Sequence, residues 1–149
     1  MYYLLLCHSL MRWLVLISIL WVLFRACKGH FFKDSFRRSD HILVSSASGL
    51  SQMQLILGFA LYFWSPIAQG FWVNKSFQWS DSLFFGIVHF LLMTVAIVLI
   101  SVGSSLAKRD SEDSKRFKVL FIYYSLALLI ILVAIPWPFS PLAQRPWLP

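Results

Sequence analysis

The sequence has 149 residues, of which 59% are hydrophobic and only 13% are charged. With a mean hydropathy of +0.73, this composition excludes an ordinary soluble domain and indicates an integral membrane protein. The length leaves room for a few spanning helices in one domain, residues 1–149, and none for a soluble catalytic domain beside them. The net charge of +7 is common where basic loops flank membrane helices, so it gives no reason to expect a nucleic-acid partner.

The first apolar stretch predicts a transmembrane helix at residues 3–24. No basic residue precedes it, and Arg25 and Lys28 follow it where a signal peptide would have a small-residue cleavage site. The pattern therefore indicates a membrane anchor and not a signal peptide. Cys7 and Cys27 stand at opposite ends of this helix, so we expect no disulfide between them.

Three further apolar stretches follow, at residues 42–64, 82–106 and 119–135. Each is close to the ~20 residues that a helix needs to cross the ~30 Å hydrocarbon core of a membrane. Pro136 and Pro138 end the last helix, because proline cannot continue the helical hydrogen bonds. The expected fold class is all-α, an integral membrane four-helix up-down bundle.

The inner half of the second predicted helix is unusually polar, with the side chains Ser45, Ser48, Ser51, Gln52 and Gln54. Such residues commonly join neighbouring helices in a membrane. A contact between Gln52 or Gln54 and a quinone headgroup is an alternative interpretation, so a quinone is a candidate partner.

Basic residues gather in and around two of the three connections between these helices. The first and third connections have the basic residues Arg25, Lys28, Lys33, Arg37, Arg38, Lys108, Arg109, Lys115, Arg116 and Lys118. The second connection has only Lys75, and the C-terminal tail has only Arg145. Under the positive-inside rule the first and third connections are cytoplasmic and both termini face outward. We expect a multi-pass protein of the bacterial inner membrane.

Two histidines, His8 and His89, lie in the first and third predicted helices. Both helices run inward from the external face, and the helical rise places both histidines roughly 8 to 10 Å below that face. First and third helices are diagonal in an up-down bundle, so side chains that face inward from them converge. The apolar stretches contain no Asp or Glu to pair with an imidazole. We therefore expect His8 and His89 to be the axial ligands of a b-type haem.

Three other residues belong to the predicted haem site. Gly86 shares a helical stripe with His89, and Gly58 falls at a similar depth in the second helix, so both would leave room for a flat ligand. Arg12 lies one turn below His8 and can reach outward to a haem propionate. The sequence has no Cys-x-x-Cys-His motif, which excludes covalently attached c-type haem. Zinc or copper would need a third or fourth ligand, and no such residue is obvious at this depth.

Each of these residues also has a plainer interpretation. A single histidine near a helix end is more often hydrogen-bonded to water or a carbonyl than bound to a metal. Arg12 would bind a lipid phosphate if the first helix began later in the chain. His30 and His41 lie among charged residues of the first connection, and we expect both to be solvated.

Two motifs in the chain are specific enough to suggest a family: His8-Ser9-Leu10-Met11-Arg12-Trp13 and Ile135-Pro136-Trp137-Pro138-Phe139. With the segment from Gln54 to Gly58 and the helix of His89, they make most of the chain resemble a family of small four-span proteins of Bacteroidota, often labelled cytochrome B. The resemblance implies a b-type haem. It also implies a histidine where this chain has Gln52, so haem binding here would depend on the other two histidines alone.

These observations support two hypotheses of different class. In the first, the chain is an electron-transfer subunit with one haem between His8 and His89, which passes electrons between quinol and a protein partner. In the second, it is a haem-free accessory subunit of a larger inner-membrane complex, in contact with lipid and other subunits. No acid–base pair or nucleophile motif is present, so we do not expect a stand-alone enzyme.

Overall fold

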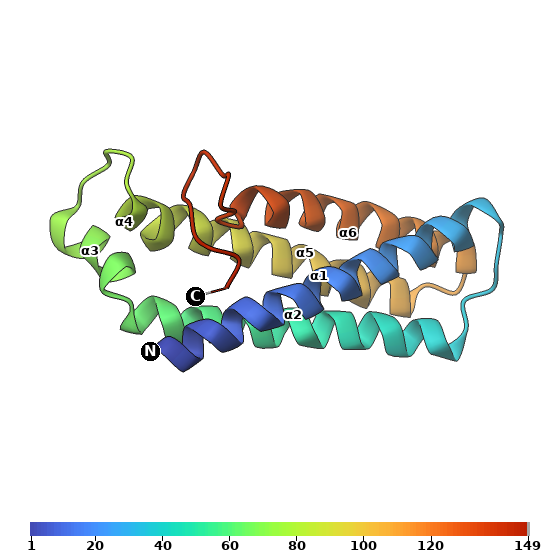
Figure 1. Ribbon diagram of the computed structural model, residues 1–149. Coiled ribbons are helices and arrows are strands. Elements are labelled where there is room, and N and C mark those ends of the chain that lie inside the picture. Colours follow the sequence, from blue (N-terminus) through green and yellow to red (C-terminus); the bar gives the residue numbers. More distant parts are fainter. Residues whose placement is uncertain (149) are drawn as a thin grey trace.

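The computed structural model describes residues 1–148, and every regular element in this range is a helix (Figure 1). The elements in chain order are α1 (Tyr2–Phe31), α2 (Arg38–Trp64), α3 (Pro66–Asn74), α4 (Asp81–Leu83), η1 (Phe84–Val88), α5 (His89–Arg109) and α6 (Asp113–Ala134). α4, η1 and α5 follow one another without a break and form one long helix, Asp81–Arg109. The all-α class predicted from the sequence is confirmed.

Four helices are long and apolar enough to cross a membrane: α1, α2, the helix Asp81–Arg109, and α6. They cover the four predicted apolar stretches except for Ile135, and their basic ends extend further. α1 continues beyond the predicted end at Phe24 to Phe31, and α6 begins at Asp113 and not at residue 119. Hydropathy marks only the part of a helix that lies in hydrocarbon, whereas the backbone hydrogen bonds continue into the polar interface.

The second connection contains a helix, α3, which hydropathy did not predict. Its start has two local signals: the Ser65 hydroxyl accepts a hydrogen bond from the Ala68 amide, and Pro66 occupies the first helical position. A serine cap followed by proline is a common helix start. Lys75, in the left-handed conformation with φ 48°, ends the helix after nine residues, too few to cross a membrane.

The long helices lie side by side and enclose a common core (Figure 1). α1 packs against α2 and α6, and α5 packs against the same two helices, which places α1 and α5 diagonally. Ile19 of α1, Ile100 of α5 and Tyr124 of α6 have no exposed surface. The Tyr124 hydroxyl is paired with the Ser104 hydroxyl at 2.8 Å, so this buried polar group is satisfied.

The outward faces of the long helices are also apolar. More than half of the side-chain surface is exposed at Leu14, Ile56, Val98 and Leu129. Large exposed apolar faces on a soluble protein would drive aggregation, whereas in a bilayer they contact lipid. The exposed apolar surface therefore agrees with the membrane class inferred from composition.

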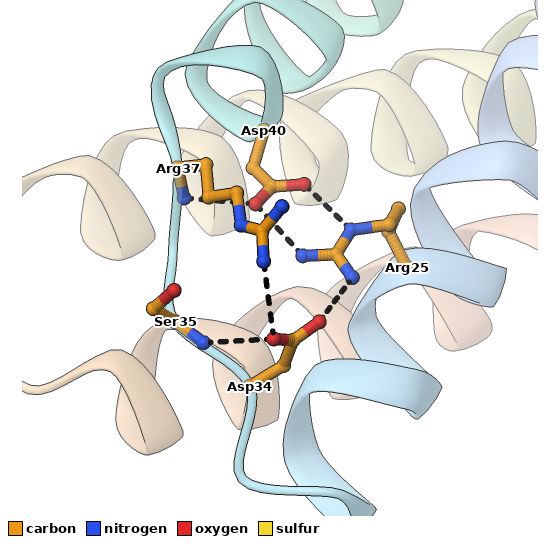
Figure 2. A network of polar contacts seen from close by, with 5 residues as sticks. All are labelled: Arg25, Asp34, Ser35, Arg37 and Asp40. Atoms are coloured by element: carbon orange, nitrogen blue, oxygen red, sulfur yellow. Dashed lines mark hydrogen bonds and ion pairs between the residues drawn. The ribbon is translucent and has the colours of Figure 1, made fainter.

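An ion-pair network joins α1 to α2 at the end of the bundle where the first connection lies (Figure 2). Arg25 donates two hydrogen bonds to Asp40, at 2.7 and 2.9 Å, and one to Asp34 at 3.0 Å. Asp40 also accepts a hydrogen bond from the Arg37 amide at the start of α2. The hydrogen bond from Arg25 lowers the pKa of Asp34 below its ordinary value. The Arg25 guanidinium lies 5.3 Å from the ring centre of Phe117, so the network also contacts α6.

Replacement of Asp40 should destabilise the protein much more than replacement of Asp34. The Asp40 side chain is 5% exposed and that of Asp34 is 27% exposed. Asp40→Ala leaves Arg25 without its main partner and removes the bond to the Arg37 amide, so we expect a loss of roughly 3 kcal/mol in the free energy of unfolding. Asp34→Ala should have a much smaller effect, because solvent screens a more exposed ion pair. Equilibrium unfolding in mixed micelles, followed by circular dichroism, measures both values, and equal losses would contradict the central role of Asp40.

Candidate functional site

One cavity of about 430 Å³ lies at the end of the bundle opposite the ion-pair network. Its volume is typical of a small-molecule site, for which the usual range is roughly 300–1,000 Å³. Most of its wall is apolar or aromatic. Its polar and charged residues are Ser9, Ser65, His8, Arg12, Gln54, Tyr62, His89 and Arg145. Four of the five predicted site residues, His8, Arg12, Gly58 and His89, therefore line one cavity.

His89 is the first residue of α5 and directly follows the π-helical turn η1. Such turns are rare and frequently occur at functional sites. The Nδ1 atom of His89 lies 2.8 Å from the carbonyl oxygen of Ala134, at the end of α6. A carbonyl can only accept, so Nδ1 donates its hydrogen, and in the neutral imidazole Nε2 then retains its lone pair. This arrangement is the one that orients a histidine for binding a metal through Nε2.

The acceptor for His89 is available because of a proline. In a continuing helix the Ala134 carbonyl would accept from the amide of residue 138. That residue is Pro138, which has no amide hydrogen. The free carbonyl therefore accepts from the imidazole of a neighbouring helix.

A second carbonyl near the end of α6 is satisfied in a similar way. The Leu132 carbonyl loses its helical donor at Pro136 and accepts instead from Trp137 Nε1 at 2.8 Å. Ile135, which precedes Pro136, has φ −69° and ψ 129°, the extended conformation expected before a proline. The Pro-Trp-Pro sequence thus ends α6 and supplies a replacement donor for one of the carbonyls it frees.

His8 lies on α1 and contacts α2. Its main-chain carbonyl accepts a hydrogen bond from Gln54 Nε2 at 2.9 Å. A side chain at Gly58 would place its Cβ 3.4 Å from His8 Cε1, so the glycine keeps the wall beside this imidazole open. His8 Nδ1 and Gln54 Oε1 are buried and have no hydrogen-bond partner among residues 1–148. Buried polar atoms without partners are costly in apolar surroundings, so contacts within the described chain leave this part of the site unsatisfied.

Gly86 does not have the place that the sequence suggested. It is absent from the cavity wall, and a Cβ at this position would lie 2.7 Å from Phe71 Cβ of α3. The glycine therefore allows α3 to approach η1, and it does not contribute to the ligand space that His89 lines. Its carbonyl accepts from the Tyr62 hydroxyl at 3.2 Å, and that hydroxyl accepts from Trp72 Nε1. The sequence correctly placed Gly86 one turn from His89, but it did not show which neighbour Gly86 faces, because hydropathy did not predict α3.

Arg12 contacts the C-terminal tail. Its Nη2 donates to the Trp147 carbonyl at 2.8 Å, and its guanidinium lies 5.3 Å from the Trp13 ring and 6.0 Å from the Trp137 ring. These distances are typical of cation–π contacts. No carboxylate within residues 1–148 pairs with Arg12, and its Nε is buried without a partner in that range. The cation is thus held by a carbonyl and aromatic rings.

The sequence gave no reason to place Arg145 and Tyr62 in the site. Arg145 pairs with Asp81 at 2.6 Å and lines the cavity. As a single basic residue near the C-terminus it carried no local signal. Tyr62 is one aromatic residue among several near a helix end, where such residues are common. His30 and His41 do not line the cavity.

The types of ligand available limit which metals the site suits. Within residues 1–148, no three His, Cys, Asp or Glu side chains gather at one place, whereas zinc and copper sites usually need three or four protein ligands. Two imidazoles suit a metal that brings its remaining ligands with it. Cys7 and Cys27 are both free and exposed.

Comparisons with protein-family models, curated proteins and solved structures found no match for this chain. The geometry of the cavity is therefore the basis for a functional proposal.

The hydrogen bond to Ala134 predicts the tautomer of His89. We expect Nδ1 to carry the hydrogen and Nε2 to be unprotonated at neutral pH, because the carbonyl accepts only. Solid-state nuclear magnetic resonance of ¹⁵N-histidine-labelled protein in bilayers distinguishes the two nitrogens, and a His89→Gln spectrum assigns the signals. A hydrogen on Nε2 alone would contradict the bond to Ala134.

Proposed function

We propose that this chain is a membrane-embedded, b-type cytochrome-like subunit that takes part in electron transfer, with one haem between His8 and His89. The observation that carries the proposal is that imidazoles from two diagonal helices line one cavity. One of them has its Nδ1 held by a carbonyl, which leaves Nε2 to bind a metal. The other two histidines, His30 and His41, do not line this cavity.

The residues of the cavity fit a haem. A porphyrin supplies four of the six bonds to iron, so two axial imidazoles complete the set without further protein ligands. Gly58 keeps the wall open beside His8, and Phe59, Phe85 and Phe90 give the cavity aromatic walls that exclude water. A bound haem would supply reversible one-electron transfer. The protein would hold it in place, set the imidazole orientation through the Ala134 carbonyl, and keep the surroundings dry.

We also propose the orientation and the location. The first and third connections lie together at one end of the bundle, because Arg116 of α6 stacks on Phe36 of the first connection at 5.2 Å. Most of the basic residues lie in these connections or on the helix ends beside them, so the positive-inside rule supports a cytoplasmic position. The long helices would then alternate in direction, with both termini and the cavity near the outer face of a bacterial inner membrane.

A second candidate function, a haem-free accessory subunit, is favoured by one surface. Gln52 is exposed on the outside of α2 and donates to the Ser101 hydroxyl of α5 at 3.2 Å. A Cβ at Gly49, less than a turn away, would meet nothing within 4 Å. Polar and small residues on the outside of membrane helices favour contact with another helix over contact with lipid. Such a contact is compatible with haem binding, so a measurement of haem content is needed to distinguish the two functions.

The histidine variants test the haem directly. Purified protein should be red, with a dithionite-reduced α-band near that of b-type haem. His8→Ala and His89→Ala should each abolish the low-spin spectrum, because each removes an iron ligand that water cannot easily replace in a dry cavity. His30→Ala and His41→Ala are matched controls outside the cavity and should keep the spectrum. Colourless wild-type protein with full helicity, supplied with haem, would favour the accessory subunit.

Labelling of introduced cysteines tests the orientation. Each cysteine is placed in a background with Cys7→Ser and Cys27→Ser, because both native thiols are exposed. Cysteines at Arg37 and Glu112 should react only from the cytoplasmic side, and cysteines at Asn74 and Gln144 only from outside. Membrane-impermeant maleimide on intact cells and on inverted vesicles gives the comparison. The reverse pattern would place the cavity near the cytoplasmic face.

A further inference from the structure

The C-terminal tail runs back across the end of the bundle and borders the cavity. Figure 1 shows it leaving the end of α6 and crossing toward α1. The Trp79 indole donates to the Leu142 carbonyl at 2.9 Å, Arg145 pairs with Asp81 at 2.6 Å, and Trp147 accepts from Arg12. Contacts with α1, with α4 and with the connection before α4 thus hold the tail in place.

Two arginines from distant parts of the chain line this cavity. Arg12 comes from α1 and Arg145 from the tail, and both line the wall. Arg145 has one carboxylate partner, Asp81, whose side chain is 49% exposed. Arg12 has none within residues 1–148, and its buried Nε is unpaired there. Cations therefore outnumber carboxylates at the cavity, although an uncompensated charge at a membrane site is unfavourable.

We propose that Arg12 and Arg145 form a cradle for the two carboxylates on one edge of a tetrapyrrole, and that the tail is a part of the binding site. The inference rests on the proposed function, because it assumes a porphyrin in the cavity. Guanidinium groups bind carboxylates through charge-assisted, often bidentate hydrogen bonds. No carboxylate within residues 1–148 competes for the Arg12 guanidinium. Asp81 and a ligand carboxylate would compete for the guanidinium of Arg145, so Asp81 weakens ligand binding. The cradle selects porphyrins with free carboxylates over their esters.

Metal-free porphyrins separate this proposal from iron ligation. The probes are protoporphyrin IX, which has two free carboxylates, and its dimethyl ester, which has none. Binding to the full chain in nanodiscs of neutral phosphatidylcholine is measured by quenching of tryptophan fluorescence, since Trp13 and Trp147 lie beside Arg12. The diacid should bind about 10- to 100-fold more tightly than the ester, the difference expected for a charge-assisted hydrogen bond.

Charge variants identify the cradle. Arg145→Gln and Arg12→Gln should each weaken diacid binding by about tenfold or more and leave ester binding unchanged. Arg38→Gln, an exposed arginine at the other end of the bundle, is the matched control and should change neither. Asp81→Asn should tighten diacid binding several-fold, because it frees Arg145 from its competing carboxylate. Misfolding cannot produce that increase, so this variant keeps the test informative if an arginine variant is unstable.

The outcomes distinguish the cradle from haem ligation. His8→Ala and His89→Ala should preserve the preference for the diacid, because no iron is present. The protein could prefer the diacid even though the haem spectra show no ligation by His8 and His89. That result would support the cradle and reject the proposal that the two histidines are axial ligands. Equal binding of diacid and ester, or equal weakening of both by Arg145→Gln, would overturn the cradle. Anionic phosphatidylglycerol in the nanodiscs could also weaken diacid binding in the wild-type protein but not in Arg145→Gln. That result would mean that the arginines bind a lipid headgroup, and it would also overturn the cradle.

Discussion

The end of α6 at Pro136 and Pro138 is the constraint on which the cavity depends. Without an amide hydrogen at residue 138, the Ala134 carbonyl has no helical donor, and it accepts from His89 of the neighbouring helix. The same break turns the chain out of the helix and sends the tail back over the cavity. One local feature of the backbone therefore sets both the orientation of an imidazole and the border of the cavity.

The opposite end of the bundle depends on a different kind of interaction. Arg25 holds Asp40 at the start of α2, and its guanidinium lies over Phe117 of α6. A charge at this depth is tolerated because carboxylates and an aromatic ring surround it. At the cavity end, Arg12 has aromatic rings but no carboxylate within residues 1–148. The first arginine is therefore paired within the bundle, whereas the second has no carboxylate partner within residues 1–148.

The chemistry of the cavity follows from a few polar groups in an apolar wall. Two imidazoles, one amide and two guanidiniums are among the few polar groups that line a cavity otherwise enclosed mainly by aliphatic and aromatic side chains. Low polarity strengthens each interaction with a ligand and makes each unpaired group unfavourable. The unpaired Nδ1 of His8 and Oε1 of Gln54 show that contacts within the described chain do not satisfy the site.

The sequence alone determined the all-α class and the four helices able to span a membrane, because runs of apolar residues of the right length have few other structures in lipid. The spacing of His8 and His89 along their helices also predicted two histidines at one level, and both line one cavity. Only the tertiary structure decided which neighbours these residues meet. Gly86 faces α3 because of a short helix that hydropathy does not detect. Arg145 reaches the cavity through a chain reversal, and contacts between residues so distant in the sequence leave no local pattern.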